Sequence, residues 1–278
     1  MNRICSHTGQ PLQLLTEADR FAISNEGIIY SLDAHTIDYE DDYFFTDYEK
    51  QYGKSYQKDE SNLRRLAKNR LQWLAKSIQN SPTYKSKPLQ LLEIGSATGF
   101  FIDEANSAGY DSVGIEVSSW ACRQAKQLGA NVIQSSFLDL TIEAESKLIE
   151  YSFDVIAAFY VIEHFADQNK IFKQIERLLR PGGYFIFALP STQGPLFQCN
   201  LQTWVATHPT DHYVDYSPQS LKQILPIYNM KSVCFRPASY HQERSCGILK
   251  RLPNFLYKAY SDSTGYGDTI ECIAKKIN

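Results

Sequence analysis

From residue 89 onward the sequence alternates between short apolar runs and helical segments, and this alternation limits the fold more than any other feature. The run LQLLEIG at 89–95 leads into a helix that we expect to end at Gly109. Strands separated by helices of this length predict a parallel sheet covered on both faces, a doubly wound α/β fold. The expected strands are 89–95, 111–117, 131–135, 153–159 and 184–190, with two later ones at 230–238 and 268–277.

Around this sheet the sequence predicts one large domain with two additions. Residues 1–57 are rich in aromatic and acidic side chains and should form an N-terminal extension or lid. Residues 58–278 should form the main domain, which starts with a helix at 59–80. The tyrosines of 43–56 either close over a ligand or pack on the surface. The aromatic-rich stretch 239–267 should be an insertion that serves as a lid or as a homodimer contact.

Composition and charge argue against several classes of function. A net charge of −3 gives no electrostatic reason for a nucleic-acid partner, and the basic cluster 64–70 alternates with leucines like the solvated face of a helix. No apolar run reaches the roughly 18 residues of a membrane span, and the N-terminus lacks the apolar core of a secretory signal. The six cysteines include no CxxC pair, which predicts reduced thiols and a cytoplasmic location. Cys5 and His7 are too few ligands for a closed zinc site.

The stretch LLEIGSATGFF at 91–101 predicts a glycine turn between a strand and a helix, where nucleotide-like cofactors bind. An NAD fingerprint, G-x-G-x-x-G, would need glycines at three places, where this sequence has Gly95, Ala97 and Phe100. A phenylalanine at the third place obstructs close packing of the helix on the strand. Glu93 would repel a pyrophosphate but suits an ammonium group, such as that of a methionine moiety.

A second acid, Glu116, ends the next expected strand. A carboxylate there can accept hydrogen bonds from both hydroxyls of a ribose. Val117 beside it is placed to line one face of an adenine. Glu93 and Glu116 together therefore favour S-adenosylmethionine over NAD.

Five blocks of the sequence resemble class I S-adenosylmethionine-dependent methyltransferases. They are LLEIGSATGFF, GIEVSSWA, SSFLDL, FDVIAAFYVIEH and LLRPGGYFIFALPS, within residues 88–195, and HPTDHYVDYSPQSL at 208–221 is a weaker match. Within the family the sequence is most similar to the small-molecule group that includes ubiquinone-biosynthesis O-methyltransferases. The resemblance implies a Rossmann-like seven-stranded sheet, mostly parallel, with an antiparallel last strand at 268–277. It also implies S-adenosylmethionine as the cofactor.

The resemblance assigns roles to the residues around the turn. Glu93 matches the acid that the family places near the amino group of the cofactor, usually through solvent. Glu116 matches the acid that binds the ribose. The glycine turn itself matches Gly95, Ala97 and Gly99, with alanine as a departure at the middle position.

Further residues complete the expected cofactor site. Ser136 and Phe137 fall where the family contacts adenine, with a serine where an acid is usual. Phe159, at the end of the fourth strand, matches the residue whose backbone meets the methionine moiety. Phe100 and Val117 are the remaining members of the expected site.

The expected general base is His164 in VIEHF, because an oxygen nucleophile must lose a proton and histidine titrates in a suitable range. The alternative is that the Glu163-His164 pair only fixes the loop. Quinone-pathway relatives use an E-x-x-E-H run as metal ligands, but here Tyr160 stands in place of the first acid. No metal site is therefore predicted.

A second polar cluster, consisting of His208, His212 and Tyr213, should face the same pocket, with His212 as a further catalytic candidate. The chain has AFYV where nucleobase and amide N-methyltransferases often carry an Asn/Asp-Pro-Pro-Tyr/Phe turn, which argues against DNA or RNA substrates. The predicted function is methyl transfer from S-adenosylmethionine to a small-molecule acceptor, at oxygen. The alternatives are an NAD-dependent oxidoreductase and a cofactor-binding protein without turnover.

Overall fold

The structure is a computed structural model, and it describes residues 3–15, 20–36, 53, 55–79, 88–149 and 153–277. Most of the tyrosine-rich stretch 43–56 lies outside these residues, so its function as a lid stays a prediction. The polar, proline-bounded stretch SPTYKSKP at 81–88, which the sequence predicts to be a linker, also lies outside them, except for its last residue.

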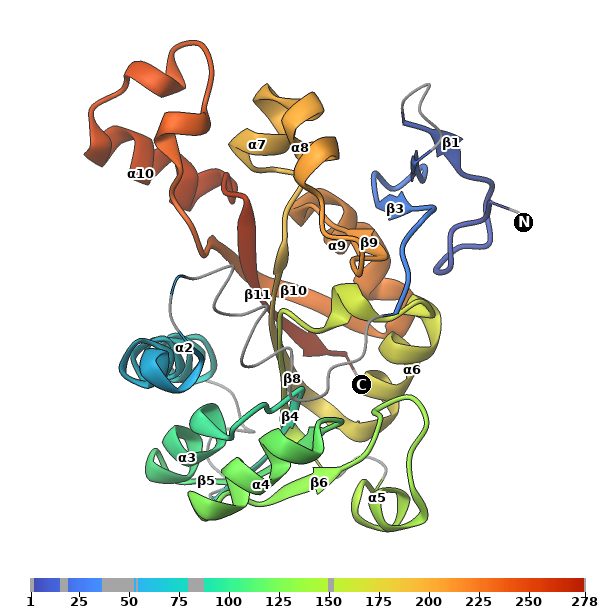
Figure 1. The fold of residues 1–278 in the computed structure, drawn as a ribbon, viewed down its shortest axis with the longest axis vertical. Coiled ribbons are helices and arrows are strands. Elements are labelled where there is room, and N and C mark those ends of the chain that lie inside the picture. The colour runs from blue at the N-terminus through green and yellow to red at the C-terminus, as the bar shows by residue number, and fades with distance from the viewer. Residues whose placement is uncertain are drawn as a thin grey trace. The chain divides into compact units, whose positions relative to one another are not determined.

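The main sheet consists of β4 (Leu89–Ile94), β5 (Tyr110–Glu116), β6 (Val132–Gln134), β7 (Phe153–Phe159), β8 (Leu179–Pro190), β10 (Met230–Pro237) and β11 (Thr269–Lys276). Their order is β10-β11-β8-β7-β4-β5-β6 (Figure 1). β4 pairs in parallel with β5 and β7, β5 pairs in parallel with β6, and β10 and β11 pair antiparallel. The predicted Rossmann-like sheet with an antiparallel strand at 268–277 is confirmed.

Five helices, including the one predicted at 59–80 and the one predicted to end at Gly109, precede or connect strands β4 to β8. They are α2 (Glu60–Ile78), α3 (Phe100–Ser107), α4 (Ser119–Gln127), α5 (Ile142–Lys147) and α6 (Gln168–Leu178). Helix α4 begins where it does because the Ser118 side chain accepts a hydrogen bond from the Ala121 N–H at 3.2 Å. Helices α3 and α4 pack against β5, and α4 also against β6 (Figure 1). Local capping and periodicity therefore account for this part of the fold.

The chain divides into two compact units. The first consists of Met1–Thr36, Phe159–Lys173 and Phe187–Ile277, and the second consists mainly of Ile37–Ala158 and Gln174–Ile186. The glycine turn and both predicted cofactor acids belong to the second unit. The predicted catalytic histidines belong to the first.

A small antiparallel sheet, which the sequence did not indicate, lies in the first unit. It consists of β1 (Gln13–Leu14), β2 (Phe21–Ile23), β3 (Ile29–Ser31) and, from much later in the chain, β9 (Val214–Asp215). Strands of two or three residues are too short to show an alternating pattern. Phe21 and Ile29 bury this sheet against Trp204 of α8 (Leu201–Thr207). The division predicted between 1–57 and 58–278 stays a prediction.

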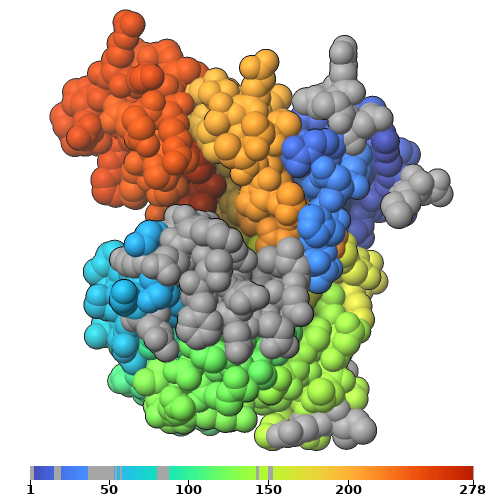
Figure 2. Space-filling view, in the orientation of Figure 1, coloured from blue at the N-terminus to red at the C-terminus, as the bar shows by residue number. Residues whose placement is uncertain are grey.

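The predicted insertion 239–267 contains two short helical turns, η6 (Gln242–Arg244) and η7 (Leu249–Arg251), and helix α10 (Asn254–Thr264). It forms a lobe of its own, drawn in orange-red in Figure 2. Helix α10 contacts β10. Among the described residues, no helix combines the length and the apolar character needed to cross a bilayer.

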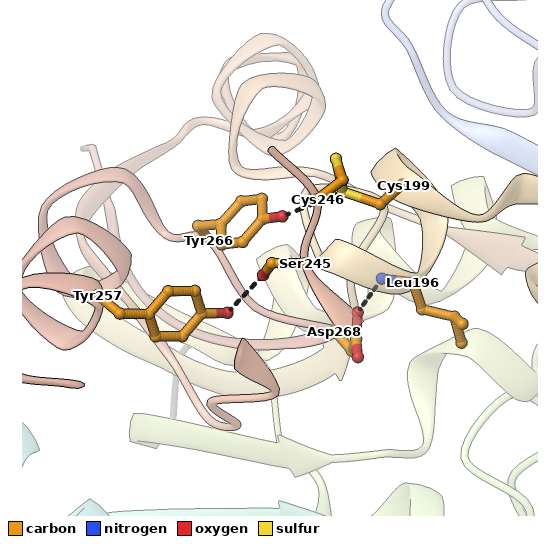
Figure 3. Close-up of a disulfide and its surroundings, with 7 residues drawn as sticks. All are labelled: Leu196, Cys199, Ser245, Cys246, Tyr257, Tyr266 and Asp268. Carbon is orange, nitrogen blue, oxygen red and sulfur yellow. Dashed lines mark hydrogen bonds between the residues drawn. A yellow bond between two sulfur atoms is a disulfide. The ribbon is translucent and has the colours of Figure 1, made fainter. Parts of the chain in front are cut away.

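One disulfide corrects the prediction of six reduced thiols. Cys199, at the end of α7 (Pro195–Cys199), is bonded to Cys246 of the insertion, and their Cα atoms are 5.7 Å apart (Figure 3). The other four cysteines form no disulfide. Because 47 residues separate the two bonded cysteines, only the tertiary structure brings them together. The argument from reduced thiols for a cytoplasmic location therefore loses its basis.

Candidate active site

The predicted glycine turn follows β4, and every second residue in it has a positive φ. Gly95 has φ 69°, Ala97 has φ 45° and Gly99 has φ 83°. The backbone N–H of Gly95 donates to the Ile115 carbonyl of β5 at 2.9 Å, which fixes the start of the turn. A left-handed conformation is strained for alanine, and such strain is often found where a backbone meets a ligand.

Gly99 is required by space as well as by its backbone conformation. A Cβ atom on Gly99 would lie 2.9 Å from the Cβ of Ala130 and 3.0 Å from the Cβ of Ala125. Gly109 also has a positive φ, but a Cβ there would meet nothing within 4 Å. A side chain at Gly99 would therefore cost both steric overlap and backbone strain, whereas one at Gly109 would cost backbone strain alone.

We expect Gly99→Ala to lower the free energy of unfolding by about 2–4 kcal/mol, because strain in the left-handed region adds to overpacking. Gly109→Ala should cost only about 1–2 kcal/mol, the conformational part alone. Urea denaturation of both variants measures the difference. Equal losses would show that the neighbours of Gly99 move aside without cost.

Glu116 ties the turn to the end of β5. Its Oε2 accepts a hydrogen bond from the Ala97 N–H at 2.8 Å, and its Oε1 accepts one from the Ser118 N–H at 2.9 Å. Burial raises the pKa of this carboxyl, and the two backbone donors act against that rise. Each carboxylate oxygen has a second lone pair, so Glu116 can accept further hydrogen bonds from a ligand.

Glu93 is buried, and its Oε2 has no hydrogen-bond partner in the part of the chain that the structure describes. Burial raises the pKa of Glu93 well above its usual range, Arg70 lowers it, and Glu116 raises it further. An orphaned buried acceptor of this kind fits a ligand that brings its own N–H or O–H donors.

Arg70 and Arg64 correct the prediction that the basic cluster 64–70 is a solvated face. Arg70 is buried, and it is the charged neighbour that lowers the pKa of Glu93. Arg64 donates to Asp103 Oδ2 at 2.6 Å and to Glu104 Oε1 at 3.0 Å, both on α3. The sequence pattern separated apolar from charged positions, but it could not show that two of these charges face acids.

Phe100 is buried at the first position of α3 and contacts two side chains, those of Tyr56 and Arg64. Its ring stacks on that of Tyr56, with 6.0 Å between centroids and 8° between planes. The guanidinium carbon of Arg64 lies 5.0 Å from the centre of the Phe100 ring. These contacts account for a phenylalanine where a dinucleotide fold needs glycine, and a role in cofactor binding stays a prediction.

Two of the three residues predicted to contact adenine line a cavity of about 640 Å³ along β6. Val117, which is 47% exposed, and Ser136 both line it. Ser136 Oγ also accepts a hydrogen bond from the Asp139 N–H at 3.3 Å. Phe137 is buried, and Phe159 ends β7 with its side chain partly exposed.

The first unit brings the predicted histidines together. His164, in the 3-10 turn η4 (Ile162–His164), has its Nδ1 3.0 Å from Asp211 Oδ2 and 3.2 Å from the Asp211 carbonyl. The His212 ring lies edge-on to that of His164, with centroids 4.8 Å apart. His208 binds Asp215 Oδ2 through Nε2 at 2.7 Å. Tyr213, by contrast, directs its hydroxyl to Thr36 Oγ1 at 2.9 Å.

Asp211, the partner of His164, was not among the site residues predicted from the sequence. The only signal was its position directly before His212 in HPTDHYVD. Adjacent residues on a loop face different neighbours, so the sequence could not show that Asp211 contacts His164 rather than His212.

Three titratable groups of this cluster, His164, His212 and Glu163, have pKa values that are shifted in different directions. Burial lowers the pKa of His164, but Asp211 and Glu163 outweigh it and hold that pKa above the ordinary value of 6.5. Burial lowers the pKa of His212 to about 4, so this ring is neutral at pH 7. Burial raises the pKa of Glu163 to about 7. His164 is therefore more basic than His212.

Ligand atoms of Glu163, His164 and His212 lie within 4.8 Å of one another, as do those of His208, His212 and Asp215. These spacings leave room for a cation. Tyr160, at the first place of the run that the quinone-pathway relatives use, is 40% exposed, and its backbone N–H donates to the Ala188 carbonyl. The prediction of no metal site stays a prediction.

Residues 60–234 match the model of a family described as a methyltransferase domain, which is more than half of the chain. The chain belongs to this methyltransferase family. The resemblance seen in the sequence is thereby confirmed, and an enzyme of this family transfers methyl groups from S-adenosylmethionine rather than hydride to NAD.

Two curated proteins similar to this methyltransferase are ubiquinone biosynthesis O-methyltransferases. The one from Albidiferax ferrireducens is 28% identical over 101 residues, which cover 36% of this chain and 40% of that protein. The one from Paracidovorax citrulli is 26% identical over 106 residues, which cover 36% and 44%. The match therefore spans less than half the length of either relative.

Solved structures share the fold of this methyltransferase at low identity. One is a methyltransferase from Thermotoga maritima, described as a possible histamine N-methyltransferase, with a TM-score of 0.54 and 16% identity over 83% of this chain and 98% of that one. A putative sarcosine dimethylglycine methyltransferase from Galdieria sulphuraria has a TM-score of 0.52 and 14% identity over 77% and 86%.

The second unit of this methyltransferase fits S-adenosylmethionine. The cofactor carries an amino group and two ribose hydroxyls, and the unpartnered Oε2 of buried Glu93 needs a donor of this kind. Glu116 retains lone pairs that can accept from hydroxyls. The donor set of the cofactor and the acceptor set of the turn are therefore complementary.

Proposed function

We propose that this methyltransferase transfers the methyl group of S-adenosylmethionine to a hydroxyl oxygen of a small-molecule acceptor. The observation that carries the proposal is the pair of His164 and Asp211, joined at 3.0 Å, with the pKa of His164 held above its ordinary value. A hydroxyl must lose its proton as the new bond forms, and a histidine of raised basicity accepts it well. An amine acceptor would need mainly to be deprotonated beforehand.

The proposal gives each protein group a task in proton transfer. The cofactor, when bound, supplies a methyl group activated by a positively charged sulfonium. His164 accepts the hydroxyl proton at Nε2, since its Nδ1 donates to Asp211. Asp211 then stabilises the imidazolium. The neutral ring of His212 packs edge-on against His164 and restricts the positions that its imidazole can take.

The sequence assignments complete the proposed cofactor site. Glu116 holds the ribose, and Glu93 accepts from the amino group through solvent. Gly95, Ala97 and Gly99 let the backbone approach the cofactor. The remaining proposed contacts are Phe100, Val117, Ser136, Phe137 and Phe159.

Two further observations support a small-molecule acceptor. The similar curated proteins are named O-methyltransferases of ubiquinone biosynthesis. The net charge of −3 is unfavourable for a nucleic-acid partner. A cytoplasmic location and a homodimer stay predictions from the sequence, and neither is needed for the proposed reaction.

A labelling screen tests the proposal. The purified protein is incubated with isotopically labelled S-adenosylmethionine and fractionated metabolite pools, and mass spectrometry finds the compound that gains the label. We expect a hydroxylated small molecule with the label in a methyl ether. A label on nitrogen, or on nucleic acid, would refute methylation at oxygen.

Replacing Glu116 tests the cofactor site separately. Glu116→Ala should weaken S-adenosylmethionine binding by about 1.5–3 kcal/mol, the scale of charge-assisted hydrogen bonds. Asp111→Ala is the matched control, because Asp111 is an exposed acid near the opposite end of the same strand, β5. Isothermal calorimetry measures both affinities. An unchanged affinity in Glu116→Ala would remove the ribose assignment.

A further inference from the structure

The stretch Gly247–Ser261 of the insertion, called here the basic-apolar segment, exposes large apolar side chains. Ile248 is 75% exposed and Phe255 is 72% exposed, the two highest values among the large apolar side chains of the described residues. Leu256 is 44% exposed. Neighbouring large apolar residues that face water commonly mark a surface that binds a partner.

Specific contacts hold this segment with its apolar side chains outward. Tyr257 and Ser261, one turn apart on α10, are buried, and the Ser245 hydroxyl donates to the Tyr257 hydroxyl at 3.2 Å (Figure 3). Phe255 precedes Tyr257 by two residues, so it lies on the opposite face of the helix. The disulfide at Cys246 fixes the start of the segment to α7. The outward direction of Phe255 therefore follows from how α10 packs.

The charge of the segment is of one sign. Lys250 and Arg251 are exposed on η7, and neither forms an ion pair with any residue that the structure describes. Lys258 is largely neutralised by Asp262, 3.1 Å away. No acid occurs between Gly247 and Ser261, although the chain as a whole has a net charge of −3. Positive charge is thus concentrated in the same stretch of the chain as the exposed apolar residues.

We infer that the basic-apolar segment docks the protein on an anionic phospholipid surface. Ile248, Phe255 and Leu256 enter the boundary between headgroups and acyl chains, and Lys250 and Arg251 meet the phosphate groups. Exposed aromatic and aliphatic side chains next to lysine and arginine are the combination that binds such interfaces. The inference does not depend on which acceptor the enzyme methylates.

A second copy of the chain fits this surface less well. A two-fold contact would place the same patch on both sides, and so bring Lys250 and Arg251 of one copy towards those of the other. Like charges repel at such a contact, whereas a bilayer with anionic headgroups attracts them.

Vesicle sedimentation of the oxidised, full-length protein tests the inference. Binding to vesicles of phosphatidylcholine with phosphatidylglycerol is compared with binding to vesicles of phosphatidylcholine alone. We expect binding to the mixed vesicles that weakens as salt is added. Absence of binding, or equal binding to both vesicle types, would overturn the inference.

Three variants assign the binding to the segment. Lys250→Gln with Arg251→Gln should lower the partition coefficient for the mixed vesicles by roughly 30-fold, and Ile248→Ser with Phe255→Ser by at least about tenfold. Ile227→Ser, which removes an exposed isoleucine of η5 (Leu225–Tyr228), should bind like the wild type. Circular dichroism and S-adenosylmethionine affinity check that each variant is folded.

Two results would assign the surface to another partner. Full vesicle binding by both double variants would place the lipid contact elsewhere on the chain. The alternative result is a protein that does not bind vesicles but forms a concentration-dependent dimer. If Ile248→Ser with Phe255→Ser abolishes that dimer, a second copy of the chain is the partner. Either result overturns lipid docking without affecting the proposed reaction.

Discussion

His164→Ala slows methyl transfer by about 10²–10⁴-fold and leaves the affinity for S-adenosylmethionine unchanged, which is the largest kinetic effect we expect from one substitution. The reason is that His164 lies in η4 beside Asp211, outside the glycine turn and the acids proposed to hold the cofactor. Losing it removes only the proposed proton acceptor. The rate is measured with the acceptor that the labelling screen identifies, and calorimetry measures cofactor binding.

The pH dependence distinguishes a base from a group that only shapes the loop. The imidazolium cannot accept a proton, so the wild-type rate should fall as pH drops through a pKa above 6.5. Asp211→Asn removes the charge that raises this pKa, and the falling limb should therefore move to lower pH. If Asp211 has only a structural role, Asp211→Asn should lower the rate without shifting the pH at which the rate falls.

A control histidine completes this test. His241→Ala changes a histidine on the insertion that is paired with exposed Glu243, and its rate should equal that of the wild type. If the His164→Ala rate stays within a few-fold of the wild-type rate, the Glu163-His164 pair only fixes the loop. Another residue would then have to remove the proton.

Features set by neighbouring residues could be predicted from the sequence. The strands of the main sheet follow from local periodicity, and α3 ends just before Gly109, the glycine that was expected to end it. The turn from Gly95 to Gly99 was recognised because glycines are needed wherever φ is positive. The family comparison confirmed the methyl donor that this turn and its acids favoured.

Features set by distant residues could not be predicted. Arg70 was interpreted as a surface residue because helical periodicity cannot tell a buried charge near an acid from a solvated one. The disulfide of Cys199 with Cys246, and the pairing of β3 with β9, join segments that no local pattern connects. Asp211 was missed because its contact with His164 spans two loops.

His7→Ala should lower the free energy of unfolding at pH 7 by about 3–5 kcal/mol, a large loss for a residue so near the N-terminus. The ring of His7 is buried, its Nε2 is 2.8 Å from the Tyr216 hydroxyl, and its Nδ1 is 2.7 Å from the Tyr228 hydroxyl. It also packs edge-on against Phe172 at 5.3 Å. Removing it leaves a cavity and two buried hydroxyls without this partner. His35→Ala, at an exposed N-terminal histidine, should cost little.

The cost of His7→Ala should depend on pH in a direction that its environment sets. Burial lowers the pKa of His7 from 6.5 to about 4, so between these values the unfolded chain binds a proton that the folded protein does not. The wild type therefore loses about 3 kcal/mol of stability from this group as pH falls from 6.5 to 4, and the alanine variant does not. The difference in unfolding free energy between the two proteins should shrink over that range. If the difference in unfolding free energy stays constant with pH, His7 keeps a nearly normal pKa in the folded protein. It then stabilises the fold through packing alone.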